Sequence, residues 1–309
     1  MDGLLLVDKP PGPTSHDVVA RLRRALGRPK TGHFGTLDPM ATGLLIVAVG
    51  QATRLNQYYA GREKSYRAVA RLGTATDTYD AEGAPRPGPA AGPIPDRDAV
   101  DRALLPLRGE IEQVPPPYSA KKIAGTPLYR LARAGQPVSP RPARVIIHDL
   151  RVLRFEPPDL ELDIRCSTGT YIRSLAHDLG QSLGCGAHLT SLRRTAVGEF
   201  RVEQASALSL WDGDAPDVAG LPFWVPLEQL LPEWPRFDLD EADARAVRDG
   251  RSLPPDRAMA TPAPSEAGPV GPDGEALIRL FDAGGRLAAL ARRDPGTSRL
   301  APFLVFPAA

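Results

Sequence analysis

The chain has 309 residues, 42% of them hydrophobic and 24% charged, and its net charge is +1. This composition is ordinary for a globular protein and leaves room for two domains. The apolar runs are far shorter than the ~20 residues that cross a bilayer, and no secretory signal pattern opens the chain. Two cysteines, Cys166 and Cys185, provide neither a disulfide framework nor a Cys/His metal array. We therefore expect a cytoplasmic protein that makes no contact with membranes.

The small net charge hides an asymmetry along the chain. Residues 1–200 carry 27 Lys and Arg against 20 Asp and Glu, whereas residues 201–309 carry 11 against 17. A basic body followed by an acidic tail is expected when the first part of a protein meets phosphate groups.

The chain opens with a predicted strand over residues 3–7. A Pro/Gly turn follows, and then a helix over 17–26 for which Thr14 and Ser15 offer the N-cap. A cluster of basic residues lies on this helix and just after it: Arg21, Arg23, Arg24, Arg28 and Lys30. The cluster is either a solvated helix face or a patch that contacts phosphates.

The stretch 32–50 joins a polar loop to a buried strand. Residues 44–49 form an apolar run closed by Gly50, which is typical of a buried strand. In the preceding loop, Pro39 fixes its own φ and pushes Asp38 towards extended backbone. A carboxylate held rigidly at the mouth of a buried strand suits nucleophilic or acid–base chemistry. The alternative is that Asp38 and Pro39 merely initiate a turn.

The middle of the chain alternates between helices, strands and proline-rich loops. Helices are predicted over 52–59, 98–105 and 128–135, strands over 64–72, 144–155 and 160–166, and irregular connections over 84–95 and 113–122. Tyr66 lies in the first of these strands, where core packing is the alternative to a functional role.

A second informative block spans residues 166–180. It predicts the end of a strand, a glycine turn and a helix capped by Thr170. Arg173 falls in the first turn of this helix, where the helix dipole disfavours a positive charge. A nearby carboxylate would compensate, and Asp38 is the candidate. The alternative is a surface arginine without a partner.

From about residue 204 the composition becomes acidic and richer in Trp and Pro. A helix is predicted over 240–249. Two apolar runs, 277–281 and 287–291, flank a Gly-containing turn and predict a β-hairpin, and a last strand is predicted over 301–307. These elements predict a small β-rich domain at the end of the chain.

Several motifs together resemble one family, the bacterial tRNA pseudouridine-55 synthases or TruB family. They are the loop His33-Phe34-Gly35-Thr36-Leu37-Asp38-Pro39-Met40-Ala41-Thr42-Gly43, the Lys64-x-Tyr66 motif and the segment Gly169-Thr170-Tyr171-Ile172-Arg173. The resemblance implies an α+β fold, the pseudouridine-synthase fold, in which helices flank a mixed, largely antiparallel sheet. It also implies a catalytic domain over 1–232, with an RNA-gripping insertion at about 110–145, and a PUA-like β-rich domain over 233–309.

The same resemblance implies that the protein isomerises uridine 55 in the T arm of tRNA to pseudouridine, with no cofactor and no metal. Asp38 would be catalytic, Arg173 would pair with it, and Tyr66 would pack on the uracil. Further residues with an implied role in binding the base or the RNA are His33, Tyr171, Leu192, Lys121 and Lys122. Asp38 could attack C1′, stabilise an oxocarbenium-like centre or take a proton from C2′, and the sequence leaves these three roles open.

Two other functions are compatible with the sequence. One is a tRNA-folding chaperone or RNA-binding module, alone or in addition to catalysis. The other is a synthase that works only inside a guide-RNA particle. The combination of Asp38, Tyr66 and Arg173 favours catalysis over binding alone. The short chain, which lacks basic terminal extensions, favours a stand-alone enzyme that acts on tRNA without a protein partner. We expect a monomer, although no feature of the sequence fixes the oligomeric state.

Overall fold

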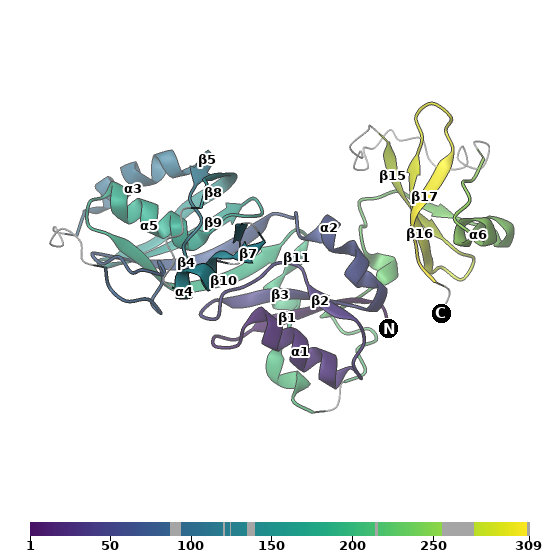
Figure 1. Cartoon of the computed structure of the whole chain (residues 1–309), viewed down its shortest axis with the longest axis horizontal. Coiled ribbons are helices and arrows are strands. Elements are labelled where there is room, and N and C mark those ends of the chain that lie inside the picture. The colour runs from purple at the N-terminus through teal and green to yellow at the C-terminus, as the bar shows by residue number, and fades with distance from the viewer. Residues whose placement is uncertain are drawn as a thin grey trace. The chain divides into compact units, whose positions relative to one another are not determined.

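The computed structural model describes residues 1–86, 94–119, 121–123, 125–134, 140–213, 216–254 and 275–307, and Figure 1 shows its elements. The chain divides into two compact units. The larger unit comprises Leu5–Ala48 and Thr53–Phe223, and the smaller comprises Met1–Leu4, Val49–Ala52 and Trp224–Ala309. Part of the predicted connection over 84–95, residues 87–93, lies outside the described residues.

A mixed sheet forms the body of the larger unit, in the order β12-β1-β3-β10-β4-β9-β8-β5. Its strands are β1 (Gly3–Lys9), β3 (Thr42–Val49), β4 (Lys64–Leu72), β5 (Gly109–Gln113), β8 (Ala143–Glu156), β9 (Asp159–Cys166), β10 (Ala187–Val197) and β12 (Ser206–Ala207). The run from β10 through β4, β9 and β8 to β5 is antiparallel, whereas β10 pairs with β3 and β1 pairs with β12 in parallel. The prediction of a mixed, largely antiparallel sheet is therefore confirmed.

Short strands and helices complete this unit. The short strands are β2 (Thr31–His33), β11 (Phe200–Arg201), and the separate pair β6 (Lys122–Ile123) and β7 (Thr126–Pro127). The helices are α1 (Ser15–Ala25), α2 (Asn56–Tyr59), α3 (Arg97–Leu104), α4 (Leu128–Arg133) and α5 (Ile172–Ser182), with 3₁₀ turns η1 (Gly50–Leu55), η2 (Leu105–Leu107), η3 (Val202–Gln204) and η4 (Leu208–Trp211). Helix α5 packs on β10, and α3 lies beside α5 (Figure 1).

Local sequence signals explain why α1 and β4 form where they do. The Thr14 side chain accepts a hydrogen bond from the backbone of Asp17 while Asp17 bonds back to Thr14, a capping box that fixes the first turn of α1. Strand β4 alternates between buried and more exposed residues along its whole length, as expected for a strand with one face on the core.

Three sequence predictions in this unit need correction. The first half of the predicted helix over 52–59 belongs to the 3₁₀ segment η1, and its second half is the short α-helix α2. Helix α5 begins after Tyr171 without a side-chain cap, because the Thr170 hydroxyl donates instead to the Ser167 carbonyl at 2.9 Å. Strands β5 and β10 were not predicted at all.

The smaller unit contains a four-stranded sheet in the order β14-β15-β16-β17. Its elements are β13 (Trp224–Pro226), η5 (Leu227–Gln229), β14 (Arg236–Asp238), α6 (Glu241–Arg248), β15 (Ala276–Phe281), β16 (Leu287–Arg293) and β17 (Leu300–Val305). The antiparallel pairing of β15 with β16 confirms the predicted hairpin, and Asp240 caps α6 through the Asp243 N–H. In the described part of the chain, no helix is long and apolar enough to span a membrane.

Candidate active site

The loop that carries Asp38 is held from two sides. The Ser15 hydroxyl donates to the Leu37 carbonyl at 3.0 Å and accepts from the Leu37 N–H at 2.8 Å. The ammonium of Lys9 donates to the carbonyls of Pro39 at 3.1 Å and Ala41 at 2.7 Å. Burial lowers the pKa of Lys9 to about 8. The backbone on both sides of Asp38 is thus tied to the start of α1 and the end of β1.

Arg173 lies directly beside Asp38, as predicted. Its Nε is 3.0 Å from Oδ2 of the carboxylate. The Arg173 side chain is only 5% exposed, whereas that of Asp38 is 35% exposed. The buried guanidinium therefore faces one carboxylate oxygen from inside the protein, and the carboxylate remains accessible.

A second carboxylate, Asp80, shares the same guanidinium. Nη1 of Arg173 donates to Oδ2 of Asp80 at 3.2 Å and to the carbonyl of Thr78 at 3.0 Å, and Nη2 donates to the carbonyl of Tyr118 at 2.9 Å. The Asp80 side chain is 4% exposed. Arg173 is thus a buried bridge between two acidic loops. Contacts from all three nitrogens of its guanidinium hold Arg173 in place. Such charge-assisted contacts are stronger than hydrogen bonds between neutral groups.

Asp80 was not among the site residues predicted from the sequence. The available signal was the polar loop around it, Thr76 to Gly83, which is rich in Thr and Asp. In the structure, this loop closes on itself because Oδ1 of Asp80 accepts hydrogen bonds from the Thr78 hydroxyl at 2.5 Å and the Glu82 N–H at 3.1 Å.

Tyr66 lies opposite Arg194 across the β4–β10 pair. Burial raises the pKa of the Tyr66 phenol, although the neighbouring Arg194 opposes the shift. Arg194 is 1% exposed. Its guanidinium donates to the carbonyls of Leu44 at 2.7 Å and Gly35 at 3.1 Å. Arg194 therefore ties the Asp38 loop to β3 and lies beside Tyr66, a role that was not predicted from the sequence.

These residues line one pocket of about 570 Å³. Of the residues with a sequence-predicted role, its walls contain Asp38, Tyr66, Lys121, Tyr171, Arg173 and Leu192; they also contain Lys64 and Arg194. The ammonium of Lys64 donates to the carbonyls of Ala60 and Arg62, and its pKa is lowered to about 8 by burial. The pocket therefore combines an accessible carboxylate, two aromatic rings and buried cations.

Two predicted residues are not part of this lining. His33 ends β2, and its ring packs edge-on against His16 with the ring centroids 6.4 Å apart. Burial lowers the pKa of His33, which favours a neutral imidazole. Lys122 begins β6, and its side chain lies outside the described part of the structure. Their implied roles remain predictions.

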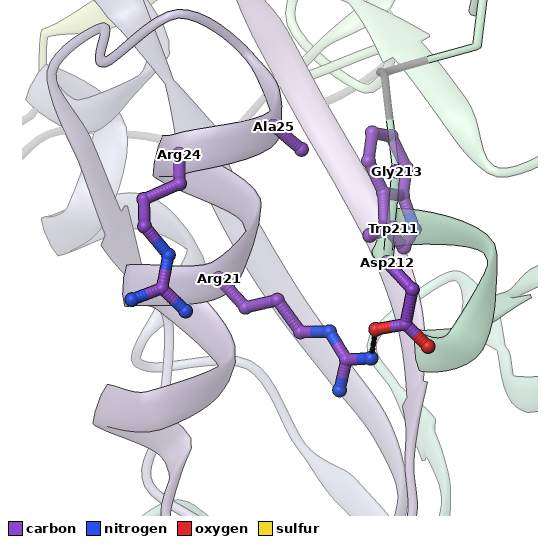
Figure 2. A pocket seen from close by; sticks show the side chains of 6 residues that line it. All are labelled: Arg21, Arg24, Ala25, Trp211, Asp212 and Gly213. Carbon is purple, nitrogen blue, oxygen red and sulfur yellow. Dashed lines mark ion pairs between the residues drawn. The ribbon is translucent and has the colours of Figure 1, made fainter.

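The basic cluster of α1 borders a different hollow, of about 420 Å³, next to η4. Figure 2 shows Arg21 directed at the carboxylate of Asp212, with which it forms an ion pair, and Arg24 directed away from that pair. Asp212 thus compensates one of the charges that made α1 a candidate for contacting phosphates.

Comparison with known proteins identifies the family. Residues 23–172 match the N-terminal domain of TruB family pseudouridylate synthases, and residues 173–212 match the C-terminal domain of tRNA pseudouridylate synthase B. The chain is 45% identical to tRNA pseudouridine synthase B of Thermobifida fusca, with 99% of this chain and 98% of the relative covered. It is 43% identical to the protein of that name from Aromatoleum aromaticum, with 98% and 92% covered. The chain belongs to the TruB family of pseudouridylate synthases.

A solved structure shares the fold of this synthase. A chain of an H/ACA RNP bound to a substrate RNA containing 2′-deoxyuridine superposes with a TM-score of 0.69 at 26% identity, covering 99% of this chain and 85% of that one. The predicted family and the α+β fold class are both confirmed. The pocket around Asp38 is accordingly the candidate active site of a uridine isomerase.

Proposed function

We propose that this synthase converts uridine 55 in the T arm of tRNA to pseudouridine, and that it does so as a monomer in the cytoplasm. The observation that carries the proposal is the accessible carboxylate of Asp38, held by the buried Arg173 in a pocket that also contains Tyr66. The similarity to relatives named tRNA pseudouridine synthase B supports tRNA as the substrate.

The reaction breaks the N1–C1′ bond of uridine, turns the detached uracil and joins C5 to C1′. The atoms are conserved, and the C5 proton is finally lost while N1 gains one. In this proposal Asp38 acts at the sugar: it attacks C1′, stabilises positive charge there, or takes a proton from C2′. Arg173 orients the carboxylate, because its buried guanidinium places Nε 3.0 Å from Oδ2.

Tyr66 is proposed to pack on the uracil and to assist proton transfer. Because burial raises its pKa, the phenol stays protonated at neutral pH and can act as a hydrogen-bond donor. Tyr171 and Leu192 would form the walls around the base, since both line the pocket. A pocket with such walls suits a base that has been flipped out of the RNA stack. Flipping the base costs a few kcal/mol.

RNA binding is proposed to involve residues around this pocket. Lys121, Lys122 and the segment 110–145 would contact the RNA backbone, and His33 would fill the space left by the flipped base. The catalytic domain would extend over 1–232, and the PUA-like domain over 233–309 would add further contacts to tRNA.

The substrate assignment is tested by mapping the product in an unmodified tRNA transcript. We expect a single pseudouridine at position 55, and none in a matched transcript with cytidine at that position. Pseudouridine at another position, or in the cytidine variant, would contradict the assignment.

The single-turnover rate should fall in acid as Asp38 becomes protonated. Burial raises the pKa of Asp38, and Arg173 opposes the shift. The ionised carboxylate is the reactive form, so the rate is full above this pKa and is lost as the pH drops through it. The midpoint should lie above ~3.9, the usual value for Asp. A rate that stays constant down to pH 4, in protein shown by circular dichroism to be folded, would contradict this prediction.

Turnover should also survive thorough chelation. Every step above uses side chains of the protein, and in the described ranges no three His, Cys, Asp or Glu residues are placed to hold a metal ion. Protein treated with excess EDTA should match untreated protein when the RNA is folded in monovalent salt. If turnover stops and is restored by a divalent ion, with the RNA structure unchanged, the cofactor-free mechanism is wrong.

A further inference from the structure

The turn that supplies Thr78 and Asp80 to Arg173 contains an unusual residue between them. Tyr79 has φ of +66°, in the left-handed region that bulky side chains rarely adopt. Such a conformation persists only when surrounding contacts over-determine it, and it is most often found near functional sites. The backbone carbonyl of Tyr79 accepts a hydrogen bond from the Leu189 N–H on β10 at 3.0 Å, which accounts for one of these contacts.

The ring of Tyr79 supplies another contact. It stacks on the ring of His177, with centroids 3.8 Å apart and planes 7° from parallel. The guanidinium of Arg86 lies over the Tyr79 ring, 5.6 Å from its centroid. His177 follows Arg173 by four residues on α5, and residues at this spacing lie on the same face of a helix. The stack therefore joins the turn to the helix that carries Arg173.

This stack differs from the other bonds of the turn. The Thr76 and Thr78 hydroxyls donate to the carbonyl and the carboxylate of Asp80, respectively, at 2.7 and 2.5 Å. Those bonds fix the shape of the turn, but they do not reach α5. The stack joins the turn to α5 through a side chain other than Arg173 itself. The two acceptors on either side of Tyr79, the Thr78 carbonyl and Oδ2 of Asp80, both bind Nη1 of Arg173.

We propose that Tyr79 and His177 are positioning residues for pseudouridine formation: their stacked rings lock the 78–80 turn onto Arg173, and the locked turn keeps Nε of Arg173 against Asp38. Neither ring lines the pocket that contains Asp38, so they act through Arg173 rather than on the substrate. The proposal rests on the role proposed for Asp38. It goes beyond that role, because it assigns a function to a ring pair outside the active-site pocket.

Loss of the stack has two predicted consequences. A guanidinium that is no longer held in place orients Asp38 less well, and displacement of reacting groups by about 1 Å slows a reaction by about a hundredfold. Arg173 lowers the pKa of Asp38 against the effect of burial, so a displaced guanidinium lets this pKa rise further. The fall of the single-turnover rate in acid, called the acid limb below, then moves to higher pH. The other charged groups near Asp38 are Asp80 and Lys9, and they remain in every variant below.

The test uses the full chain and an unmodified tRNA transcript. Tyr79→Ala and His177→Ala should each lower the single-turnover rate between about tenfold and about a hundredfold and shift the acid limb upwards, with the Kd for tRNA unchanged. Tyr79→Phe and His177→Phe keep two stacked rings and should retain the wild-type rate and acid limb. The double alanine variant should be no slower than either single variant, because both remove the same contact.

The phenylalanine variants also separate positioning from titration of nearby groups. His177→Phe removes the ionisable imidazole, and Tyr79→Phe removes the phenol. Burial raises the pKa of Asp178, next to His177, to about 6, and Arg86 is the neighbouring cation. Both groups are kept in all variants. If the acid limb shifts in the alanine variants but not in the phenylalanine variants, the shift is caused by loss of the stacked rings and not by loss of an ionisable group.

Three results would overturn the proposal. The first is alanine variants with the wild-type rate and acid limb. The second is a weaker Kd for tRNA with an unchanged rate, which would mean that the rings contact RNA. The third is phenylalanine variants as slow as the alanine variants. If even the wild type makes no product, the proposed substrate is wrong, and the pKa of Asp38 can then be titrated directly by carbon-13 NMR. An unchanged Asp38 pKa in the alanine variants would overturn the positioning role, and a raised one would support it.

Discussion

Replacing Asp38 with Asn is expected to abolish pseudouridine formation while leaving the affinity for tRNA nearly unchanged. The amide keeps the size of the side chain and its suitability for a turn before Pro39, but it cannot attack C1′ or take a proton. The loop itself is held by Ser15 and Lys9 through bonds to its backbone carbonyls, not to the carboxylate. Arg173 keeps a carboxylate partner in Asp80, so its buried guanidinium is still paired after the substitution.

We expect the single-turnover rate of Asp38→Asn to fall by at least about a thousandfold, equivalent to ~4 kcal/mol of barrier. Affinity should persist because phosphate and stacking contacts away from Asp38 supply most of it. Both quantities can be measured on the same transcript, by product analysis and by filter binding. A residual rate within about tenfold of the wild type, ~1.4 kcal/mol, would mean that another residue carries the chemistry. A pure chaperone would make no pseudouridine even as wild type.

Arg173→Lys should be nearly as damaging although it keeps the positive charge. The guanidinium contacts Asp38, Asp80 and the Tyr118 carbonyl from three different nitrogens. A lysine ammonium is a single point with three donors, and it cannot reproduce this planar spread. At least one of the carboxylates therefore loses its partner, and removing one partner of a buried ion pair typically costs about 3–5 kcal/mol.

The loss in Arg173→Lys should appear both as a lower Tm and as a single-turnover rate reduced by more than about a hundredfold, ~2.7 kcal/mol. Arg71→Lys is the matched control. Arg71 also binds a carboxylate, with Nε and Nη2 at 2.8 and 2.9 Å from Asp159, but this pair is exposed, and exposed pairs contribute about 0–1 kcal/mol. If Arg173→Lys turns over like the wild type and Arg71→Lys, the bridge between the two acidic loops is unimportant for catalysis.

The parts of the fold that could be predicted are those in which one physical signal dominates. Strand β4 alternates in burial along its length, and α1 has a cap at Thr14 and apolar residues on one face, so each pattern matches a single type of element. Strand β10 is different. Two register shifts interrupt its pairing with β4, at Leu189/Ser191 and Arg194/Ala196. A bulge of this kind interrupts the period of two expected of a strand, although β8, which carries two such shifts against β9, was still predicted.

The residues of the candidate site also fall into two groups, those that were predicted from the sequence and those that were not. Asp38 and Arg173 are unusual in their local sequence, because the first precedes a proline and the second starts a helix against its dipole. They could be predicted as a pair mainly because each also lies in a motif that resembles the family. Asp80 and Arg194 can be recognised as site residues only from the contacts that they make in the folded chain. Asp80 becomes a site residue through Arg173, 93 positions away, and Arg194 through carbonyls about 150 positions away. Such long-range partners leave no periodic signal in the chain, and the polar loop around Asp80 does not by itself point to Arg173.

The most direct measurement is single-turnover conversion of a bare T-arm stem-loop by the purified chain, with no other protein or RNA present. The pocket, the paired Asp38 and Arg173, and Tyr66 all belong to this one chain. We therefore expect stoichiometric formation of one pseudouridine, at the position that corresponds to uridine 55. The H/ACA RNP chain that shares this fold belongs to a larger particle. If the purified chain makes no product on a correctly folded stem-loop, and product forms only when a second protein or a guide RNA is added, the proposal of a self-sufficient tRNA pseudouridine synthase is contradicted.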